Sequence, residues 1–257
     1  MPVIQQYNHN ALRNFSYLIY CDKTKDAIII DPFDGEEVSK IIKDNDLQPR
    51  MIVNTHEHWD HIQGNSFLTE AYDLEVIYQD CFAQAYPGIT KTVKSKEEIT
   101  LGETIKLRFL SSPGHTESHL TILLTENNKN IAVFSGDTLF NAGVGNCKNG
   151  GDPKVLYQTI NSIYDQLGDE LIVYPGHDYL ENNLKFTLSI EDNVDARQLL
   201  ERQVNNEFNE KPLSMAVERK INLFLIDNRK LLKKNDKFSQ DSDEQIFVKL
   251  RKIRDQW

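Results

Sequence analysis

Two patterns of hydrophobic and polar residues alternate along the first two thirds of the chain. Short runs rich in Ile, Leu, Val and Tyr are bounded by polar connectors, which is typical of buried strands. Other stretches carry apolar residues at helical spacing, such as Val38, Ile41 and Ile42. The patterns predict strands at residues 16–21, 26–31, 51–55, 75–79, 104–110, 119–125, 130–135 and 170–177, and helices at residues 36–45, 64–72 and 153–167.

The pattern changes after Tyr179. Beyond it, apolar residues recur at helical spacing, for example Ile246, Leu250 and Ile253, and no convincing strand run follows. We therefore expect an α/β domain over residues 1–179 and a helical C-terminal domain over residues 180–257. A chain of 257 residues is long enough for both.

The composition of the chain argues against some classes of binding partner and indicates a cellular compartment. The chain has 39 acidic and 29 basic residues, a net charge of -10, which argues against nucleic acid and anionic membranes as partners. An anionic ligand would need a local basic patch. The three cysteines form no CxxC pair, and the chain shows neither a signal peptide nor an apolar run long enough to span a membrane. These features predict a cytoplasmic protein with reduced thiols, and leave its oligomeric state open.

The most informative segment is THEHWDH at residues 55–61. His56 and His58 are two positions apart, so in an extended segment they point the same way and suit one metal ion. Asp60 and His61 are adjacent, so we expect a loop conformation there that lets them converge on a second metal. Glu57 and Trp59 lie between these residues and are expected to shape the loop.

Three further candidates lie in similar places. His115 in SPGHT, Asp137 in FSGDT and His177 in YPGHD each follow a glycine after a predicted strand. Imidazole and carboxylate ligands suit zinc, iron and manganese. Two such ions about 3.5–4 Å apart can share a hydroxide formed at neutral pH. His9 and His119 lack this setting, and we expect both to be structural.

The motifs THEHWDH, GHT, SGDTLF and PGHDY occur in this order over residues 55–179 and resemble the metallo-β-lactamase superfamily. The resemblance implies an αββα sandwich with a dinuclear metal site at one edge. Carried over by motif, it implies that the first metal is bound by His56, His58 and His115, the second by Asp60, His61 and His177, and that Asp137 bridges both.

Within that superfamily the chain is similar to glyoxalase II, the hydroxyacylglutathione hydrolases. The similarity rests on HWDHIQGN, GDTLFNAGVG and YPGHDYLENNLKF, followed by a helical region that ends in FVKLRKIRDQW. In that family the C-terminal helices complete a glutathione pocket, which implies Tyr179, Arg251 and Arg254 as substrate-binding residues. Independently, positions 251 and 254 share a helix face, and guanidinium groups suit a carboxylate.

The stretch NCKNGG at residues 146–151 departs from the family. Asn146 stands where the better-known members have a lysine that touches glutathione, and Lys148 stands where they have a tyrosine. Either Lys148 supplies the charge from a shifted place, or the thiol portion is held differently. Cys147 lies in the same stretch without an identifiable base, so we do not expect it to be catalytic.

The resemblance implies hydrolysis of S-2-hydroxyacylglutathione, such as S-D-lactoylglutathione, in methylglyoxal detoxification. A metal-bridging hydroxide would attack the thioester carbonyl, with Asp60 orienting it. Zinc is the first choice for the two divalent metals, and iron and manganese are alternatives. The competing hypotheses are a persulfide dioxygenase with a single iron and a hydrolase of a non-glutathione thioester. The extension at residues 180–257 favours the hydrolase, because the dioxygenases have a short C-terminal region.

Overall fold

A computed structural model describes residues 2–82, 88–205 and 212–257. It divides into two compact units that interleave along the chain. The first unit comprises residues 1–111, 118–136 and 176–178, and the second comprises residues 112–117, 137–175 and 179–257. The expected single boundary after residue 179 stays a prediction, since these units are defined by contacts and not by one cut in the sequence.

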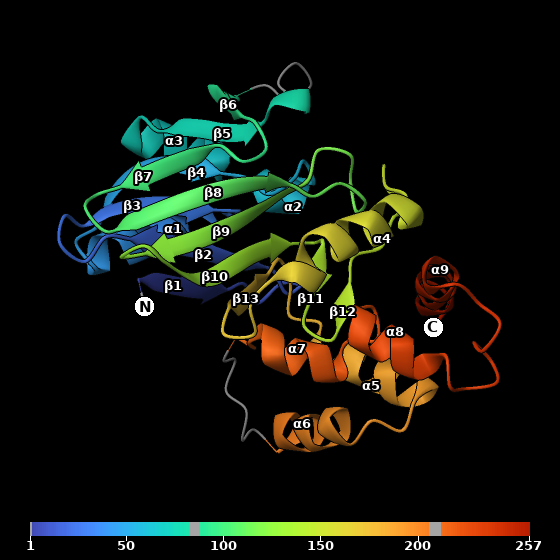
Figure 1. Cartoon of the computed structure of the whole chain (residues 1–257). Helices are drawn as coiled ribbons and strands as arrows, with labels where there is room; N and C mark the ends of the chain where they lie inside the picture. The colour runs from blue at the N-terminus through green and yellow to red at the C-terminus, as the bar shows by residue number, and fades with distance from the viewer. Residues whose placement is uncertain (1, 83–87, 206–211) are drawn as a thin grey trace. The chain divides into compact units, whose positions relative to one another are not determined.

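The first unit contains a six-stranded mixed sheet (Figure 1). β1 to β3 are antiparallel and β3 to β6 are parallel. β2 and β3 are almost wholly buried, as expected for their continuous apolar runs. In sheet order the strands are β1 (Val3–Tyr7), β2 (Phe15–Tyr20), β3 (Asp26–Ile30), β4 (Gln48–Val53), β5 (Glu75–Gln79) and β6 (Lys91–Val93).

A second, antiparallel sheet of the same unit packs against the first (Figure 1). The rings of Tyr17 on β2 and Phe134 on β10 meet edge to face with their centroids 5.2 Å apart, so apolar side chains fill the space between the sheets. In sheet order these strands are β10 (Lys129–Gly136), β9 (Leu120–Glu126), β8 (Ile105–Ser111) and β7 (Glu98–Leu101).

Two helices of the first unit, α1 (Gly35–Asp44) and α3 (Asn65–Tyr72), cover the outer face of the mixed sheet. Asp34 caps α1 by accepting hydrogen bonds from the backbone N–H groups of Glu36 and Glu37. Val38 and Ile42 then bury against the sheet. Two shorter turns, α2 (Trp59–Ile62) and η1 (Asp80–Phe82), follow β4 and β5.

The second unit is mainly helical and has its own apolar core. That core includes Leu184, Leu199 and Ile221, which lie on three different helices. Its elements are β11 (Leu139–Phe140), β12 (Gly143–Val144), α4 (Pro153–Ser162), η2 (Tyr164–Gln166), β13 (Ile172–Pro175), α5 (Leu180–Ile190), α6 (Val194–Val204), α7 (Met215–Ile221), α8 (Ile226–Leu232) and α9 (Asp243–Arg254).

The predicted α/β fold with a helical C-terminal region is confirmed, and each predicted strand and helix has a counterpart. The helix expected over residues 153–167 ends earlier, at Ser162, and continues as the 3-10 turn η2. The sequence did not indicate β1, β6 or β7, because their short stretches mix polar and apolar residues. Among the described helices, none has the length and apolar character needed to cross a membrane.

Candidate metal centre and anion pocket

The segment after β4 brings histidines together in the first unit. His56 is buried and His58 is half-buried, and His56 Nε2 lies 3.0 Å from His58 Nδ1. Their ring nitrogens lie close together, although the backbone bends at His56 and is not extended throughout. The loop expected at Asp60 and His61 is wrong, since both lie on the helical turn α2.

Asp60, His61 and His177 form a compact group in the same unit. Asp60 Oδ2 lies 3.6 Å from His61 Nε2 and 3.4 Å from His177 Nε2, and the two Nε2 atoms are 3.2 Å apart. All three side chains are buried. The ligand atoms lie within 4.8 Å of one another, so this group can hold a metal ion.

The outer ring nitrogens of these histidines fix the tautomer. His177 Nδ1 lies 2.9 Å from the backbone carbonyl oxygen of Leu12, and His61 Nδ1 lies 2.9 Å from Asp31 Oδ2. Carbonyl and carboxylate oxygens only accept, so each Nδ1 is the donor, and in a neutral ring the lone pair then lies on the inward Nε2. That arrangement is common in proteins that bind metal through histidine, and the residues therefore fit a metal ion.

Two polar residues that the sequence analysis missed hold this group. Asp31 also accepts hydrogen bonds from the backbone N–H and the hydroxyl of Thr55, at 2.7 and 2.5 Å. Asn14 donates from Nδ2 to Asp60 Oδ2 at 2.9 Å. Asp31 follows directly after β3, in the same strand-end position as the predicted ligands, and this position was a signal that could have found it.

His115 and Asp137 lie together in the second unit. His115 Nε2 is 3.4 Å from Asp137 Oδ2, and His115 Nδ1 is 2.6 Å from the backbone carbonyl oxygen of Asn146. A Cβ on Gly145 would lie 2.0 Å from the carbonyl oxygen of Asp137 and 2.8 Å from His115 Nδ1, so only glycine fits there. The same tautomer argument places the lone pair of His115 on Nε2.

The glycines before the predicted ligands are only partly equivalent. Gly114 and Gly136 have φ values of +137° and +47°, which favour glycine, as expected from the sharp turns. Gly176 does not adopt the left-handed conformation. It lies in a bend directly after β13, where its carbonyl oxygen accepts from Phe15 N and its N–H donates to the carbonyl oxygen of Gly136, both at 2.8 Å.

The remaining residues of the segment, Glu57 and Trp59, and the other two histidines, His9 and His119, lie in different surroundings. Glu57 accepts hydrogen bonds from the hydroxyls of Tyr78 and Ser118, at 3.1 and 2.6 Å. Trp59 is exposed, with its ring 6.1 Å from that of Phe33. His119 is fully buried and stacks on His56. His9 is exposed and contacts the ring of Tyr7.

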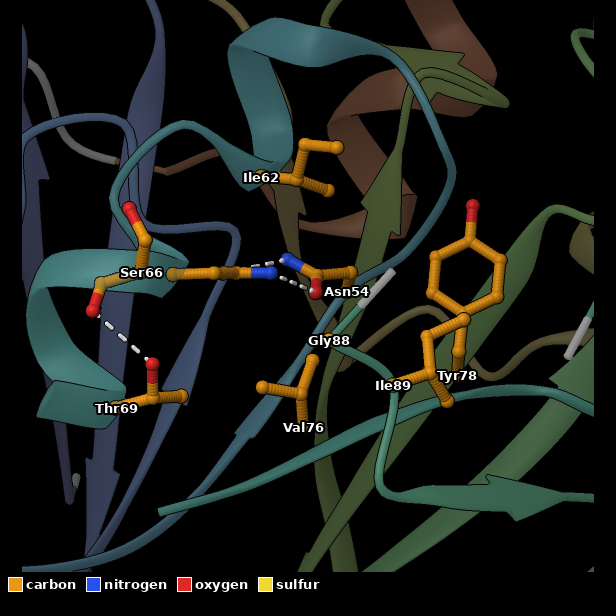
Figure 2. A pocket seen from close by; sticks show the side chains of 9 residues that line it. Asn54, Ile62, Ser66, Thr69, Val76, Tyr78, Gly88 and Ile89 are labelled. Atoms are coloured by element: carbon orange, nitrogen blue, oxygen red, sulfur yellow. Dashed lines mark hydrogen bonds between the residues drawn. The ribbon is translucent and has the colours of Figure 1, made fainter. Parts of the chain in front are cut away.

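A cavity of about 240 Å³ is lined by Asn54 and Ile62, the residues on either side of the segment at 55–61 (Figure 2). Asn54 and Asn65 form an amide pair across it, and Asn54 Nδ2 also donates to the carbonyl oxygen of His61 at 2.8 Å. The cavity therefore borders the backbone that carries His61, and its lining includes Tyr78, the residue that holds Glu57.

A second cavity, of about 300 Å³, lies in the second unit, and we call it the anion pocket. Its lining includes all four residues that the sequence analysis proposed for substrate binding, namely Lys148, Tyr179, Arg251 and Arg254. Three of these are cationic, and Asp255 is the acidic residue among the lining residues. This is a local basic patch on an acidic chain, the condition expected for an anionic ligand.

The two arginines of the anion pocket are held differently. Arg251 is buried, donates from Nη1 to the carbonyl oxygens of Val144 and Gly145 at 2.7 and 3.2 Å, and pairs through Nη2 with Asp255 at 3.0 Å. Arg254 is half-buried and donates from Nη2 to Asn183 Oδ1 at 3.3 Å. Arg254 is thus the more accessible of the two guanidinium groups.

The residues of the NCKNGG stretch approach the anion pocket. Asn146 and Lys148 both line it, and Lys148 Nζ donates to the carbonyl oxygen of Asp255 at 3.2 Å. Burial raises the pKa of the Cys147 thiol to about 12, so this thiol is protonated at neutral pH. A protonated thiol is a poor nucleophile, in keeping with the expectation that Cys147 is not catalytic.

Comparison with known proteins assigns both parts of the sequence. The Metallo-beta-lactamase superfamily profile matches residues 9–177, and the profile for the hydroxyacylglutathione hydrolase C-terminus matches residues 178–257. Hydroxyacylglutathione hydrolases of Polaromonas sp. and Nitrosococcus oceani are 39% and 38% identical to this chain, with 100% of each chain covered.

The fold is also similar to solved structures. The crystal structure of ETHE1 from Myxococcus xanthus matches with a TM-score of 0.69 and 23% identity, covering 98% of this chain and 91% of that chain. The chain therefore has the metallo-β-lactamase fold with mixed sheets and a helical C-terminal region.

Proposed function

Because this chain belongs to the hydroxyacylglutathione hydrolase family of the metallo-β-lactamase superfamily, we propose that it hydrolyses S-2-hydroxyacylglutathione to glutathione and a 2-hydroxy acid. S-D-lactoylglutathione, formed in methylglyoxal detoxification, is the substrate proposed first. The match over residues 178–257 favours this hydrolase over a persulfide dioxygenase.

The anion pocket is the observation that carries the choice of a glutathione thioester. Glutathione has two carboxylates, and Lys148, Arg251 and Arg254 gather in one cavity of a chain with a net charge of -10. Arg254 is the proposed partner of a substrate carboxylate, because its guanidinium group is half-buried and less committed to the protein than that of Arg251. Lys148 is proposed to supply charge from its shifted position, and Tyr179 to line the thiol portion.

The donor set supports two divalent metal ions per chain, with zinc first and iron or manganese as alternatives. We assign His56, His58 and His115 to one metal and Asp60, His61 and His177 to the other, with Asp137 between them. Three histidines whose outer nitrogen donates to an oxygen support this assignment, since their Nε2 atoms have the tautomer that binds metal.

The protein residues then have distinct roles in hydrolysis. The histidines and aspartates assigned above would hold the metal ions, which would lower the pKa of water and polarise the thioester carbonyl. Asp60 orients the attacking water, and Asn14 holds the Asp60 carboxylate in place through a 2.9 Å hydrogen bond. A C–O bond forms at the carbonyl carbon, the C–S bond breaks, and the glutathione thiolate takes up a proton.

We propose that this protein acts in the cytoplasm. The three cysteines, Cys21, Cys81 and Cys147, are thiols outside any disulfide, which suits a reducing compartment. The proposed partner is a small thioester. Neither nucleic acid nor membrane is proposed, given the acidic charge of the chain.

The test is steady-state hydrolysis of S-D-lactoylglutathione by the metal-replete protein, followed by loss of thioester absorbance. Wild type should turn the substrate over, and Asp60→Asn should lose about 100-fold or more of kcat, because an amide cannot act as the carboxylate does. Asp34→Asn is the matched control and should retain activity, because Asp34 caps the N-terminus of α1 and asparagine can also serve as an N-cap. Absence of turnover by the wild type would refute the proposed function.

A further inference from the structure

One carboxyl group of the second unit is fully buried and has no part in the proposed reaction. Glu218 lies on α7 with 0% of its surface exposed. Three neutral groups donate to its carboxylate. Asn141 Nδ2 bonds to Oε1 at 2.9 Å, while Ala142 N and Asn222 Nδ2 bond to Oε2 at 2.9 and 3.1 Å. Burying a carboxylate is costly, so a buried carboxylate without a cationic partner calls for an explanation.

Two of the three donors, Asn141 and Ala142, belong to the turn between β11 and β12, which borders the anion pocket. Ala142 occupies this turn with a φ of +57°, a conformation that side-chain-bearing residues rarely adopt. Asn222 also donates to the carbonyl oxygens of Phe140 and Gly143, at 3.3 and 3.0 Å. Glu218 and Asn222 together therefore hold the turn at residues 140–143 through hydrogen bonds from α7 and its C-cap.

Two hydrogen-bond routes lead from this turn to the arginines of the anion pocket. Along the chain, Val144 and Gly145 present their carbonyl oxygens to Arg251 Nη1. Across the chain, the carbonyl oxygen of Asn141 accepts from Asn183 Nδ2 at 2.9 Å, and Asn183 Oδ1 accepts from Arg254 Nη2 at 3.3 Å. Each guanidinium group is thus oriented by an acceptor whose place depends on the turn.

We propose that Glu218 is a positioning residue for substrate: it holds the turn at residues 140–143 so that Arg251 and Arg254 face an anionic ligand in the anion pocket. The proposal rests on the proposed function for the identity of that ligand. It assigns no contact between Glu218 and substrate. Its effect should therefore fall on recognition of the anionic thiol portion and not on the chemistry at the carbonyl.

The variant that tests this is Glu218→Gln, which keeps shape and removes charge. A glutamine has one acceptor oxygen, so its NH₂ group must face Asn141 Nδ2 on one side or Ala142 N and Asn222 Nδ2 on the other. Each variant is assayed with S-D-lactoylglutathione and with the lactoyl thioester of N-acetylcysteamine, which carries no charge. Asn193→Ala removes the cap of α6 together with a hydrogen bond to the carbonyl oxygen of Lys220 on α7, and serves as the control for lost stability.

Glu218→Gln should raise KM for the glutathione thioester about tenfold and leave kcat and the hydrolysis of the neutral thioester within about twofold. Asn193→Ala should change neither the KM for the glutathione thioester nor the hydrolysis of the neutral thioester. A parallel loss on both substrates, or unchanged KM, would overturn the proposal. Asn141→Ala breaks one of the three bonds, and should raise the same KM by a smaller factor if Glu218→Gln does not fold.

Direct binding of glutathione separates this proposal from the proposed function. Trp257 lines the anion pocket and lies against Arg254, so its fluorescence in a Trp59→Phe background reports binding. Glu218→Gln should raise Kd for glutathione about tenfold. If wild type binds glutathione but does not cleave the thioester, only the proposed function fails. If Kd is unchanged by the variant, or wild type does not bind glutathione, the positioning role is refuted.

Discussion

At the scale of single residues, Asp31 holds three groups of the metal-binding segment at once. Its carboxylate accepts from the backbone and hydroxyl of Thr55 and from Nδ1 of His61. It has 2% of its surface exposed, so water cannot replace these bonds. Asp31 thus helps to orient His61, and with it the direction of Nε2.

We therefore predict that Asp31→Asn weakens metal binding about 10- to 100-fold, the usual effect of losing such an outer partner. The measurement is competition with a chelator, read as metal retained per chain. The control Asp34→Asn changes a nearby carboxylate that contacts the N-terminus of α1 and not His61. Equal metal affinity of Asp31→Asn and wild type would contradict the prediction.

At the scale of elements, α9 depends on a buried arginine. Arg229 is fully buried and pairs with Asp165 on η2 and with Asp243 at the start of α9. Its guanidinium group also donates to Asn161 and to the carbonyl oxygen of Phe224. The arginine thereby fastens α9, which carries Arg251 and Arg254, to three other segments of the second unit.

Arg229→Met should lower the free energy of unfolding by about 3–5 kcal/mol, because it leaves the buried Asp165 without its cation. Urea unfolding followed by circular dichroism measures this. The matched control is Arg197→Met on α6, whose pair with Asp192 is exposed and should contribute at most about 1 kcal/mol. Similar losses for the two variants would show that Arg229 has no special role.

The buried carboxyl group of Glu218 on α7 should make the stability of the protein depend on pH. Burial raises the pKa of Glu218 to about 7 from 4.5 in spite of its three hydrogen bonds, and no charged neighbour contributes to the shift. Between these two pH values the folded protein holds a proton that the unfolded chain releases. The contribution of Glu218 to stability is therefore greatest at low pH and falls as pH rises through about 7.

We expect wild type to lose about 3 kcal/mol relative to Glu218→Gln between pH 4 and pH 8, since the pKa rises from 4.5 to about 7 on folding and a tenfold change in an equilibrium constant corresponds to about 1.4 kcal/mol. Urea unfolding of both proteins across this range gives the difference. Parallel pH profiles for wild type and variant would show that Glu218 does not titrate in this way.

At the scale of the whole molecule, the sequence predicted the helices and strands better than it predicted the residues that hold the site residues in place. Apolar runs are a local signal for strands, and residues 26–30 form β3 as predicted. The histidine segment follows β4, a second strand that the sequence predicted. Asn14, Asp31 and Glu218 escaped notice because their roles come from partners far along the chain. Asn14 meets Asp60, and Glu218 meets Asn141, only after folding.

The same reasoning explains the contrast between the two arginines. Their spacing predicted a shared helix face, and both line the anion pocket. Spacing could not show that Arg251 is committed to the carbonyl oxygens of Val144 and Gly145 while Arg254 is more exposed. Those acceptors lie more than 100 residues away in the sequence, so only the folded chain reveals the difference.

The central claim, that this protein is a dinuclear metal-dependent hydrolase of glutathione thioesters, is tested most directly by metal titration. Protein stripped of metal is mixed with increasing zinc, and S-D-lactoylglutathione hydrolysis is followed together with bound metal. We predict no activity without metal and activity that saturates at about two ions per chain. Hydrolysis that is absent at every metal load, or that saturates at one ion, would contradict the account.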